Sequence, residues 1–307
     1  MSIIGAGKVG STAAQLLAYK GFCDIVLVNR TAEVAKGIAL DIKESSAIEE
    51  FDVDIVGTGD YSEISGSDVV AITAGQQRKE GMSRDDLLMV NAGIVAAAAE
   101  QVREHAPGSK LIVVTNPLDE MVYLASKKTG FQKQRIMGMA GVLDSCRFRS
   151  FIAAELKVSA SDVSVLVLGS HGDLMLPLPR YASVGGIPLE QLMSADRIAS
   201  IVERTRNAGA EIIALEKNSS AFYAPASSLV LMIESMVKNK RMTLPCSAYL
   251  NGEYGIEGIF IGVPVVLGSN GIERVVELEL NAAEKEAFQT SANKIKTSVS
   301  QLDKLGV

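Results

Sequence analysis

The first 140 residues alternate short apolar runs with longer segments in which apolar residues recur at helical spacing. The apolar runs are rich in Val and Ile and almost free of polar residues, which is typical of strands buried on both faces of a sheet. We expect strands over residues 2–4, 24–28, 52–56, 68–73 and 110–115. Helices are expected between them, near residues 8–19, 32–44, 84–105 and 118–128. This alternation predicts an α/β fold, a Rossmann-type doubly wound parallel sheet.

The second half of the chain has a different pattern, which predicts an α+β domain. Helical periodicity is expected over residues 143–155, 194–216, 226–239 and 281–304. Strands are expected at 163–168 and, flanking the turn-rich residues 251–255, at 242–250 and 258–266. We therefore expect one domain over residues 1–140 and a second over 141–307. No Gly/Ser/Pro-rich linker separates them, so we expect the two halves to pack tightly.

Composition narrows the class of protein. Hydrophobic residues make up 48% and charged residues 21%, which is typical of a folded enzyme. The net charge is −6, and the longest basic stretch, residues 238–241, resembles an ordinary turn, so we expect no nucleic-acid partner. No apolar run is long enough for a membrane span, and residues 2–5 open directly into a strand and a turn without signal-peptide features. We expect a cytoplasmic protein.

The cysteines and histidines carry little sign of metal chemistry. Cys23, Cys146 and Cys246 are odd in number and lack metal-type spacing, so we expect free and mostly buried thiols in a reducing compartment. The chain has 2 histidines, which argues against a structural zinc site, and we expect no metal. One of them, His105, is expected at the end of a helix, where a histidine suits the dipole.

A glycine-rich turn follows the first expected strand and opens the first expected helix. Its residues, Gly5, Ala6, Gly7, Lys8, Val9 and Gly10, fit the pattern G-x-G-x-x-G. In this context the first glycine permits the tight turn, the second admits a pyrophosphate and the third lets helix and strand approach closely. The helix N-terminus then offers free N–H groups to the phosphates. The segment predicts a dinucleotide cofactor, whereas an ordinary glycine turn is the alternative.

The end of the second expected strand bears on the choice of cofactor. NAD-specific folds usually place an acidic residue there to hold the ribose hydroxyls, but this chain has Asn29 followed by Arg30. Asn removes the repulsion of a 2′-phosphate, and Arg can pair with that phosphate. One hypothesis is that NADP is accepted. The alternative is that Asn29 still binds the ribose of NAD while Arg30 points to solvent.

Three further segments hold candidate chemistry, each with a simpler alternative. Residues 75–84 follow the fourth expected strand and carry Arg78 and Arg84. They could form a lid whose two arginines bind a substrate with two carboxylates, and a solvated basic loop is the alternative. Asp144 and Arg147 are spaced i, i+3 on an expected helix, where a surface ion pair is the alternative. His171 stands between glycines after an expected strand and could act as a general base, or be structural.

In combination these segments resemble the lactate/malate dehydrogenase superfamily, and specifically the lactate-dehydrogenase-like malate dehydrogenases. The resemblance runs from Gly5 to beyond Glu273 and includes several separated motifs in the family order. They are Ala-Leu-Asp at 39–41, Thr-Asn-Pro-Leu-Asp at 115–119, Leu-Asp-Ser-Cys-Arg-Phe-Arg at 143–149, His-Gly-Asp at 171–173, Ala-Phe-Tyr-Ala-Pro-Ala at 221–226 and Gly-Val-Pro at 262–264.

The resemblance implies roles for matching positions. His171 would be the catalytic base, Asp144 would orient and stabilise it, and Arg147 would hold the C1 carboxylate. Arg84 would polarise the carbonyl group in the reverse reaction. A second group would meet the nicotinamide cofactor, NAD or NADP: Asn116, which would also meet the substrate, Asn91 and the backbone near Val114.

Substrate choice rests on Arg78. Similar lactate dehydrogenases place Gln at the third position after the glycine that corresponds to Gly75, and Arg there suits the second carboxylate of malate or oxaloacetate. The resemblance departs from the family pattern at Asn29, at Glu80, where malate members usually have Pro, and at Ser170.

The expected activity is therefore malate dehydrogenase, an oxidoreductase reaction of the tricarboxylic acid cycle. One alternative is a lactate or broad 2-hydroxyacid dehydrogenase, and a remote one is a nucleotide-binding regulator that has lost its chemistry. The family further implies a homo-oligomer, a tetramer rather than a dimer.

Overall fold

The computed structural model describes residues 1–77, 84–217 and 219–304, and of Arg84 only the main chain. The N-terminal half forms a parallel sheet in the order β3-β2-β1-β4-β5-β6. Its strands are β1 (Ser2–Ile4), β2 (Ile25–Val28), β3 (Ile55–Thr58), β4 (Val69–Ile72), β5 (Lys110–Val113) and β6 (Ile136–Gly138). This is the strand order of a dinucleotide-binding doubly wound fold, so the predicted fold class is confirmed.

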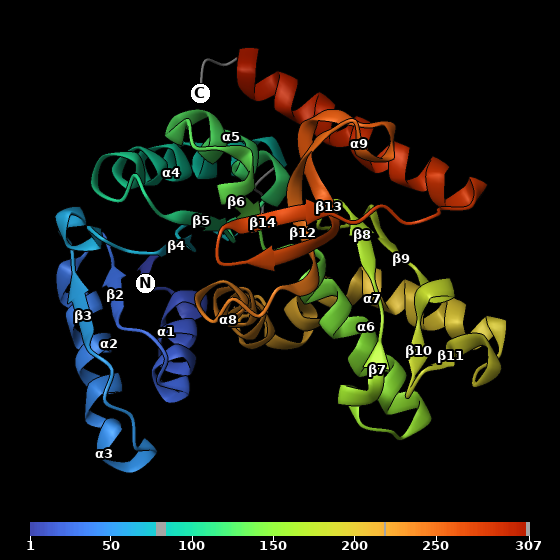
Figure 1. Cartoon of the computed structure of the whole chain (residues 1–307), viewed down its shortest axis with the longest axis horizontal. Helices are drawn as coiled ribbons and strands as arrows, with labels where there is room; N and C mark the ends of the chain where they lie inside the picture. The colour runs from blue at the N-terminus through green and yellow to red at the C-terminus, as the bar shows by residue number, and fades with distance from the viewer. Residues whose placement is uncertain (78–83, 218, 305–307) are drawn as a thin grey trace.

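Helices cover both faces of this sheet (Figure 1). Along β4 the side chains alternate, with Val69 and Ala71 in one apolar core and Val70 and Ile72 in the other. The first core is closed by α1 (Lys8–Lys20), α2 (Ala32–Glu44) and α8 (Tyr223–Val237), and the second by α4 (Arg84–His105) and α5 (Leu118–Thr129). The last helix, α9 (Ala282–Lys304), packs mostly against the first core and reaches the second with Leu302. A single turn, α3 (Ser46–Glu49), follows α2. Burial on both faces accounts for the nearly continuous apolar runs of these strands.

In this half of the sheet one expected strand was misplaced and one strand was not expected. The third strand was expected at 52–56 but begins at Ile55, because its register is set by pairing with β2, where Ile55 lies opposite Ile25. It is the edge strand, and Val56 is 43% exposed, so its own hydrophobic pattern is weak. The short β6 was not expected at all, since three residues that end in glycine carry no readable periodicity.

The C-terminal half extends the same sheet with antiparallel strands. These are β12 (Met242–Asn251), β13 (Glu257–Gly268), β8 (Val167–Gly169) and β9 (Met175–Pro177), with β14 (Gly271–Val275) beside β13. The junction between the halves is the pairing of Ser247 in β12 with Gly138 in β6. A Cβ on Gly138 would lie 2.9 Å from the Cβ of Ser247, so glycine is what lets the two strands meet. The halves therefore share one continuous sheet.

The rest of the second half surrounds a third, smaller core. The helices α6 (Gly141–Leu156) and α7 (Ala195–Glu216) pack there beside a three-stranded sheet of β7 (Val163–Ser164), β10 (Ser183–Val184) and β11 (Ile187–Pro188). The expected strand 163–168 is thus divided between two sheets, as β7 and β8. Figure 1 shows this region at the far end of the molecule from β3. Short 3₁₀ turns are η1 (Tyr61–Ile64), η2 (Lys133–Arg135), η3 (Ala160–Asp162), η4 (Pro179–Tyr181), η5 (Leu189–Gln191) and η6 (Glu253–Gly255).

The three thiols are free, as expected, but they are less buried than expected. Cys246 is buried in β12 and Cys23 is half-buried, whereas Cys146 is exposed on α6, so for Cys146 the expectation was wrong. His105 ends α4, as expected. No helix within the described ranges has both the length and the apolar character needed to cross a membrane.

Candidate active site

The glycine loop has a shape that other residues could not take. Gly5 has a φ of +115°, and a Cβ there would lie 2.6 Å from the main-chain nitrogen of Ala74. A Cβ on Gly10 would lie 1.9 Å from the carbonyl oxygen of Gly5, so helix α1 can approach the loop only with glycine at this position. The loop is thus tightly held between β1 and α1, as the pattern of glycines predicted.

The start of α1 fits a phosphate group. Gly7 caps the helix without any side-chain hydrogen bond, so the first N–H groups of α1 are not occupied by a cap. A Cβ on Gly7 would meet no atom within 4 Å, so space is open where a pyrophosphate would approach. The next residue, Lys8, donates from Nζ to Oγ of Ser219 at 2.9 Å, and the Nζ lies 5.1 Å from the ring centre of Phe222. This contact ties the glycine loop to the α7–α8 connection and was not expected from the sequence.

Asn29 lies at the end of β2 and braces the glycine loop. Its Oδ1 accepts a hydrogen bond from the N–H of Ala6 at 3.3 Å, and its Nδ2 donates to the carbonyl oxygen of Thr31 at 3.2 Å. Arg30 follows and is exposed, and within the described ranges its side chain has no hydrogen-bond or ion-pair partner. The guanidinium of Arg30 is therefore available beside the loop that would hold the dinucleotide.

The loops after β4 and β5 are joined by a buried amide. Asn91 is fully buried in α4, and its Oδ1 accepts from the N–H of Gln76 at 2.7 Å. Its Nδ2 donates to the carbonyl oxygens of Gln76 at 3.1 Å and of Asn116 at 2.6 Å. Asn116 itself is exposed and precedes a cis peptide bond to Pro117. Asn91 thus lies beneath these loops, at the carboxyl edge of the sheet where ligands of such folds bind.

Val114 lies in the same region and continues β5. Its N–H donates to the carbonyl oxygen of Ile72 at 2.9 Å, and its half-buried side chain packs against the first apolar core. Its main chain therefore has a defined position next to Asn116.

Asp144 and Arg147, three residues apart on α6, meet His171 from a distant loop at the start of this helix. The Oδ2 of Asp144 lies 2.8 Å from Nδ1 of His171, and its Oδ1 lies 3.4 Å from the guanidinium of Arg147. Asp144 is 1% exposed, whereas the side chains of His171 and Arg147 keep 13% and 12% exposure. The carboxylate is therefore shielded, whereas the imidazole and the guanidinium retain access to solvent. The Asp144–Arg147 pair therefore belongs to a buried cluster with His171 and is not the isolated pair on the helix surface that was the alternative.

The surroundings of His171 set opposing influences on its pKa. Burial is the largest of them and lowers the pKa of the imidazole, but the charge of Asp144 and the hydrogen bond to it outweigh burial. The pKa of His171 is therefore raised above its usual 6.5. Because the Asp144 carboxylate accepts from Nδ1–H, the neutral ring presents Nε2 as a proton acceptor. This is the arrangement that a general base needs.

Arg147 is arranged to receive an anion. Its buried Nε has no hydrogen-bond partner among the described residues. A buried donor without a hydrogen bond costs free energy. Gly209 of α7 faces the guanidinium, and a Cβ there would lie 3.8 and 3.9 Å from its two terminal nitrogens. A bound carboxylate would satisfy this guanidinium.

Asp119, at the start of α5, also contacts the His171 loop, and the sequence analysis did not single it out. It is 2% exposed, accepts from Oγ of Ser247 at 2.6 Å, and accepts from the N–H of His171 at 3.2 Å. Burial, the largest influence, together with the neighbouring charge of Glu120, raises its pKa from 3.8 to about 7. Its membership in the Thr-Asn-Pro-Leu-Asp motif was the only signal in the sequence.

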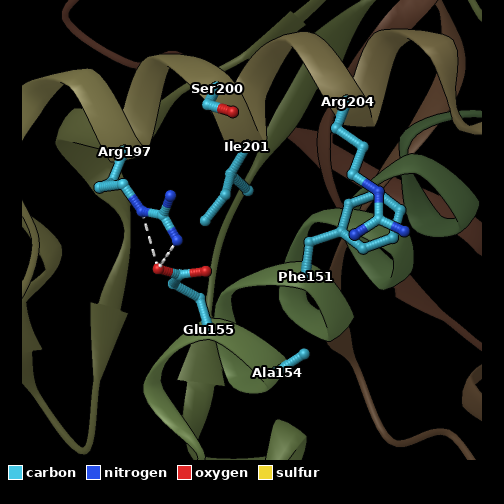
Figure 2. Close-up of a pocket in the computed structure, with 7 residues that line it drawn as sticks. All are labelled: Phe151, Ala154, Glu155, Arg197, Ser200, Ile201 and Arg204. Atoms are coloured by element: carbon cyan, nitrogen blue, oxygen red, sulfur yellow. Dashed lines mark hydrogen bonds and ion pairs between the residues drawn. The ribbon is translucent and has the colours of Figure 1, made fainter.

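A separate cavity of about 220 Å³ lies between α6 and α7 (Figure 2). Its arginines are already engaged, because Arg197 donates to Glu155 and Arg204 lies over the ring of Phe151 at 4.2 Å while pairing with Glu211. The cavity holds no member of the His171 cluster, so we do not assign the chemistry to it.

Two expected substrate residues are not placed by the structure. Arg78 lies outside the described residues, and Arg84 begins α4 but its side chain also lies outside the described part. In the part of the chain that the structure describes, no group of three His, Cys, Asp or Glu side chains could hold a metal ion.

Comparisons with known proteins agree with this geometry. Residues 1–138 match the family model of the lactate/malate dehydrogenase NAD-binding domain, and residues 141–305 match that of the alpha/beta C-terminal domain. A malate dehydrogenase from Trichormus variabilis is 54% identical over 299 residues, which cover 97% of this chain and 92% of that protein.

Solved structures are similar over nearly the whole chain. A crystal structure of a Cryptosporidium parvum malate dehydrogenase matches with a TM-score of 0.96 and 43% identity, covering 99% of this chain and 98% of that one. A lactate dehydrogenase from the same organism, complexed with lactic acid and β-nicotinamide adenine dinucleotide, matches with a TM-score of 0.95 and 40% identity, covering 98% and 97%. Malate and lactate enzymes thus share this fold, and the fold alone does not separate them.

Proposed function

The chain belongs to the lactate/malate dehydrogenase family, and we propose that it is a malate dehydrogenase, interconverting L-malate and oxaloacetate with a nicotinamide dinucleotide. The observation that carries the proposal is the cluster of His171, Asp144 and Arg147. It provides a base with a fixed tautomer and a half-buried cation for a carboxylate. Relatives named malate dehydrogenase, 54% and 50% identical over nearly the full length, support the choice of substrate.

The proton moves at Nε2 of His171. A bound nicotinamide would accept a hydride from C2 of malate, or return it to oxaloacetate. In malate oxidation His171 takes the hydroxyl proton, and the charge that develops on its ring lies 2.8 Å from the carboxylate of Asp144. In oxaloacetate reduction the protonated ring donates to the carbonyl oxygen. Arg147 holds the C1 carboxylate, so that C2 is kept beside the imidazole.

The remaining roles concern the loops at the carboxyl edge of the sheet. Arg84 polarises the carbonyl group of oxaloacetate. Asn116 would contact both substrate and nicotinamide, and Asn91 and the main chain of Val114 hold the loops that surround it. Residues 5–10 at the start of α1 would hold the dinucleotide phosphates, because the space at Gly7 and the uncapped N–H groups fit them.

Arg78 selects the substrate by pairing with the second carboxylate of oxaloacetate. A buried carboxylate without its arginine is costly, so we expect discrimination against pyruvate of about 10³-fold or more. The test is steady-state reduction of oxaloacetate and of pyruvate by the wild type and by Arg78→Gln. We expect the variant to lose oxaloacetate activity and gain pyruvate activity. A wild type that prefers pyruvate would make the protein a lactate or broad 2-hydroxyacid dehydrogenase, and a wild type inactive on both would refute the proposed chemistry.

The cofactor preference follows from Asn29 and Arg30. We propose that NADPH is used as well as NADH, because Asn29 is neutral and Arg30 is a free, exposed cation beside the glycine loop. Arg30→Ala should then lower kcat/KM with NADPH by about tenfold while the value with NADH changes little. Lys36→Ala, which removes an exposed cation from the next helix, is the matched control. A wild type that favours NADH by more than about tenfold would refute the phosphate interpretation.

The assembly is proposed to be a homo-oligomer, a tetramer rather than a dimer. Large apolar side chains remain exposed on the single chain, among them Ile48 at 83%, Leu215 at 76% and Tyr223 at 69%. Light scattering after size exclusion would measure the mass directly, and a monomer would refute this. A cytoplasmic location and a part in the tricarboxylic acid cycle stay predictions from the sequence.

A further inference from the structure

We propose that Asp119 is a positioning residue for catalysis: its buried carboxyl group anchors the main chain of His171 and places a second negative charge beside the imidazole. This rests on the proposed function, because it assigns Asp119 a part in the proton transfer by His171. The proposal starts from a group that the mechanism above does not use, a carboxyl 2% exposed at the junction of the two halves.

The first observation is that one carboxyl group joins three separate segments. Asp119 belongs to α5, in the dinucleotide-binding half. Its Oδ1 accepts from the hydroxyl of Ser247 in β12 at 2.6 Å, and its Oδ2 accepts from the N–H of His171 at 3.2 Å. Ser247 is also the residue of β12 that pairs with Gly138 of β6, where the two halves of the sheet meet. The carboxyl therefore relates the histidine loop to both halves at once.

The second observation concerns the hydrogen bonds to the main chain beside His171. Gly169 and Gly172 on either side of His171 have φ values of +83° and +148°, a region that glycine enters easily. Among the described residues, two side chains accept from the main chain between them: Oγ of Ser291 in α9 accepts from the N–H of Ser170 at 2.7 Å, and Asp119 accepts from the N–H of His171 at 3.2 Å. Removing the carboxyl of Asp119 leaves the imidazole bonded to Asp144 but takes away the bond that fixes the main chain of His171.

The third observation concerns charge. Asp119 faces His171 and is flanked on its own helix by Glu120, while His171 is faced from α6 by Asp144 and Arg147. The carboxyl of Asp119 acts in the same direction as Asp144 and raises the pKa of His171, against the opposing effects of burial and Arg147. Burial raises the pKa of Asp119 itself to about 7, so its carboxyl carries the negative charge mainly above that pH. The two carboxyls therefore stabilise the imidazolium from two sides.

The anchor and the charge can be separated by two variants. In Asp119→Asn the amide oxygen still accepts from the His171 N–H and the amide N–H₂ can donate to Ser247, so the anchor stays and the charge is lost. In Asp119→Ala both are lost. Ser291→Ala is the matched control, because it removes the neighbouring anchor without removing a charge.

The first measurement is kcat and KM for oxaloacetate across pH, per folded enzyme. We expect Asp119→Ala to lower kcat by about tenfold or more with a smaller change in KM, because displacing the base harms the proton transfer. Asp119→Asn should keep most of kcat at its own optimum, and the alkaline limb of its profile should move to lower pH. If Asp119→Ala keeps the wild-type kcat, or if Asp119→Asn leaves the pH profile unmoved, the proposal is overturned.

The second measurement does not depend on activity. With 2 histidines in the chain, His105→Gln leaves a single imidazole, whose titration can be followed by NMR of ¹³C-labelled histidine. We expect the titration of His171 to shift to lower pH in Asp119→Asn, and an unchanged titration would refute the charge effect. If the wild type reduces neither keto acid but the His171 titration still shifts in Asp119→Asn, the proposed function is overturned and the effect of Asp119 on His171 stands.

Discussion

Replacing Asp144 with Asn removes the charge that faces the imidazole of His171 while nearly keeping the shape of the side chain. Asp144 is 1% exposed, and its Oδ2 lies 2.8 Å from Nδ1 of His171. In the variant an amide N–H₂ can face Nδ1, which favours the ring tautomer whose proton is on Nε2, the wrong one for a base. The imidazolium also loses its counter-ion. Both effects act on the transition state, where the ring gains or loses its proton.

The magnitude follows from the burial of the pair. Removing one partner of a buried ion pair costs about 3–5 kcal/mol, and each 1.36 kcal/mol of barrier is a factor of about ten in rate. We therefore expect Asp144→Asn to lower kcat/KM for oxaloacetate by about 10²- to 10⁴-fold. Since Asp144 raises the pKa of His171, the alkaline limb of the pH profile should also move to lower pH.

The assay is steady-state oxaloacetate reduction from acid to alkaline pH, with the folded fraction checked by circular dichroism. Asp303→Asn is the matched control, because it removes a carboxylate that pairs with Lys127 on the surface and is 42% exposed. The reasoning fails if folded Asp144→Asn keeps more than about one-tenth of the wild-type kcat/KM, or if its profile does not move.

Three further changes test other parts of the structure. Arg147→Lys should raise KM for oxaloacetate by about tenfold or more, because lysine cannot form two parallel bonds to a carboxylate, and an unchanged KM would exclude Arg147 from substrate binding. Gly10→Ala should abolish folding or dinucleotide binding, seen as lost NADH fluorescence enhancement, since the new Cβ would lie 1.9 Å from the Gly5 carbonyl oxygen. Hydrogen bonds, first from Lys240, lower the pKa of Glu234 to about 2, so Glu234→Gln should lower the free energy of unfolding by about 2 kcal/mol at neutral pH after allowance for solvent screening. That stability is present above the unfolded pKa near 4.5 and is lost as the pH falls toward 2. The denaturant unfolding curves of the wild type and of Glu234→Gln should therefore converge at acid pH.

Much of the local structure could be read from the sequence. Alternating apolar runs and helical periods placed the dinucleotide-binding fold, and α2 and α4 begin and end at the expected residues. The glycine loop was recognisable because its three glycines are required by local geometry, within one turn and the start of one helix. Asp144 and Arg147 could be placed on one helix face because i, i+3 spacing is a local property.

The tertiary structure alone decided which of these local features meet. Asp144 contacts a histidine 27 residues away, and Asp119 meets Ser247 across 128 residues, contacts that no local spacing encodes. The same is true of β6, β12 and the register of β3, whose places depend on partner strands. Hydrophobic periodicity reports which face of an element is buried, but not what lies against that face. The identity of the side chains was therefore local information, whereas their geometry and the direction of their pKa shifts came only from packing.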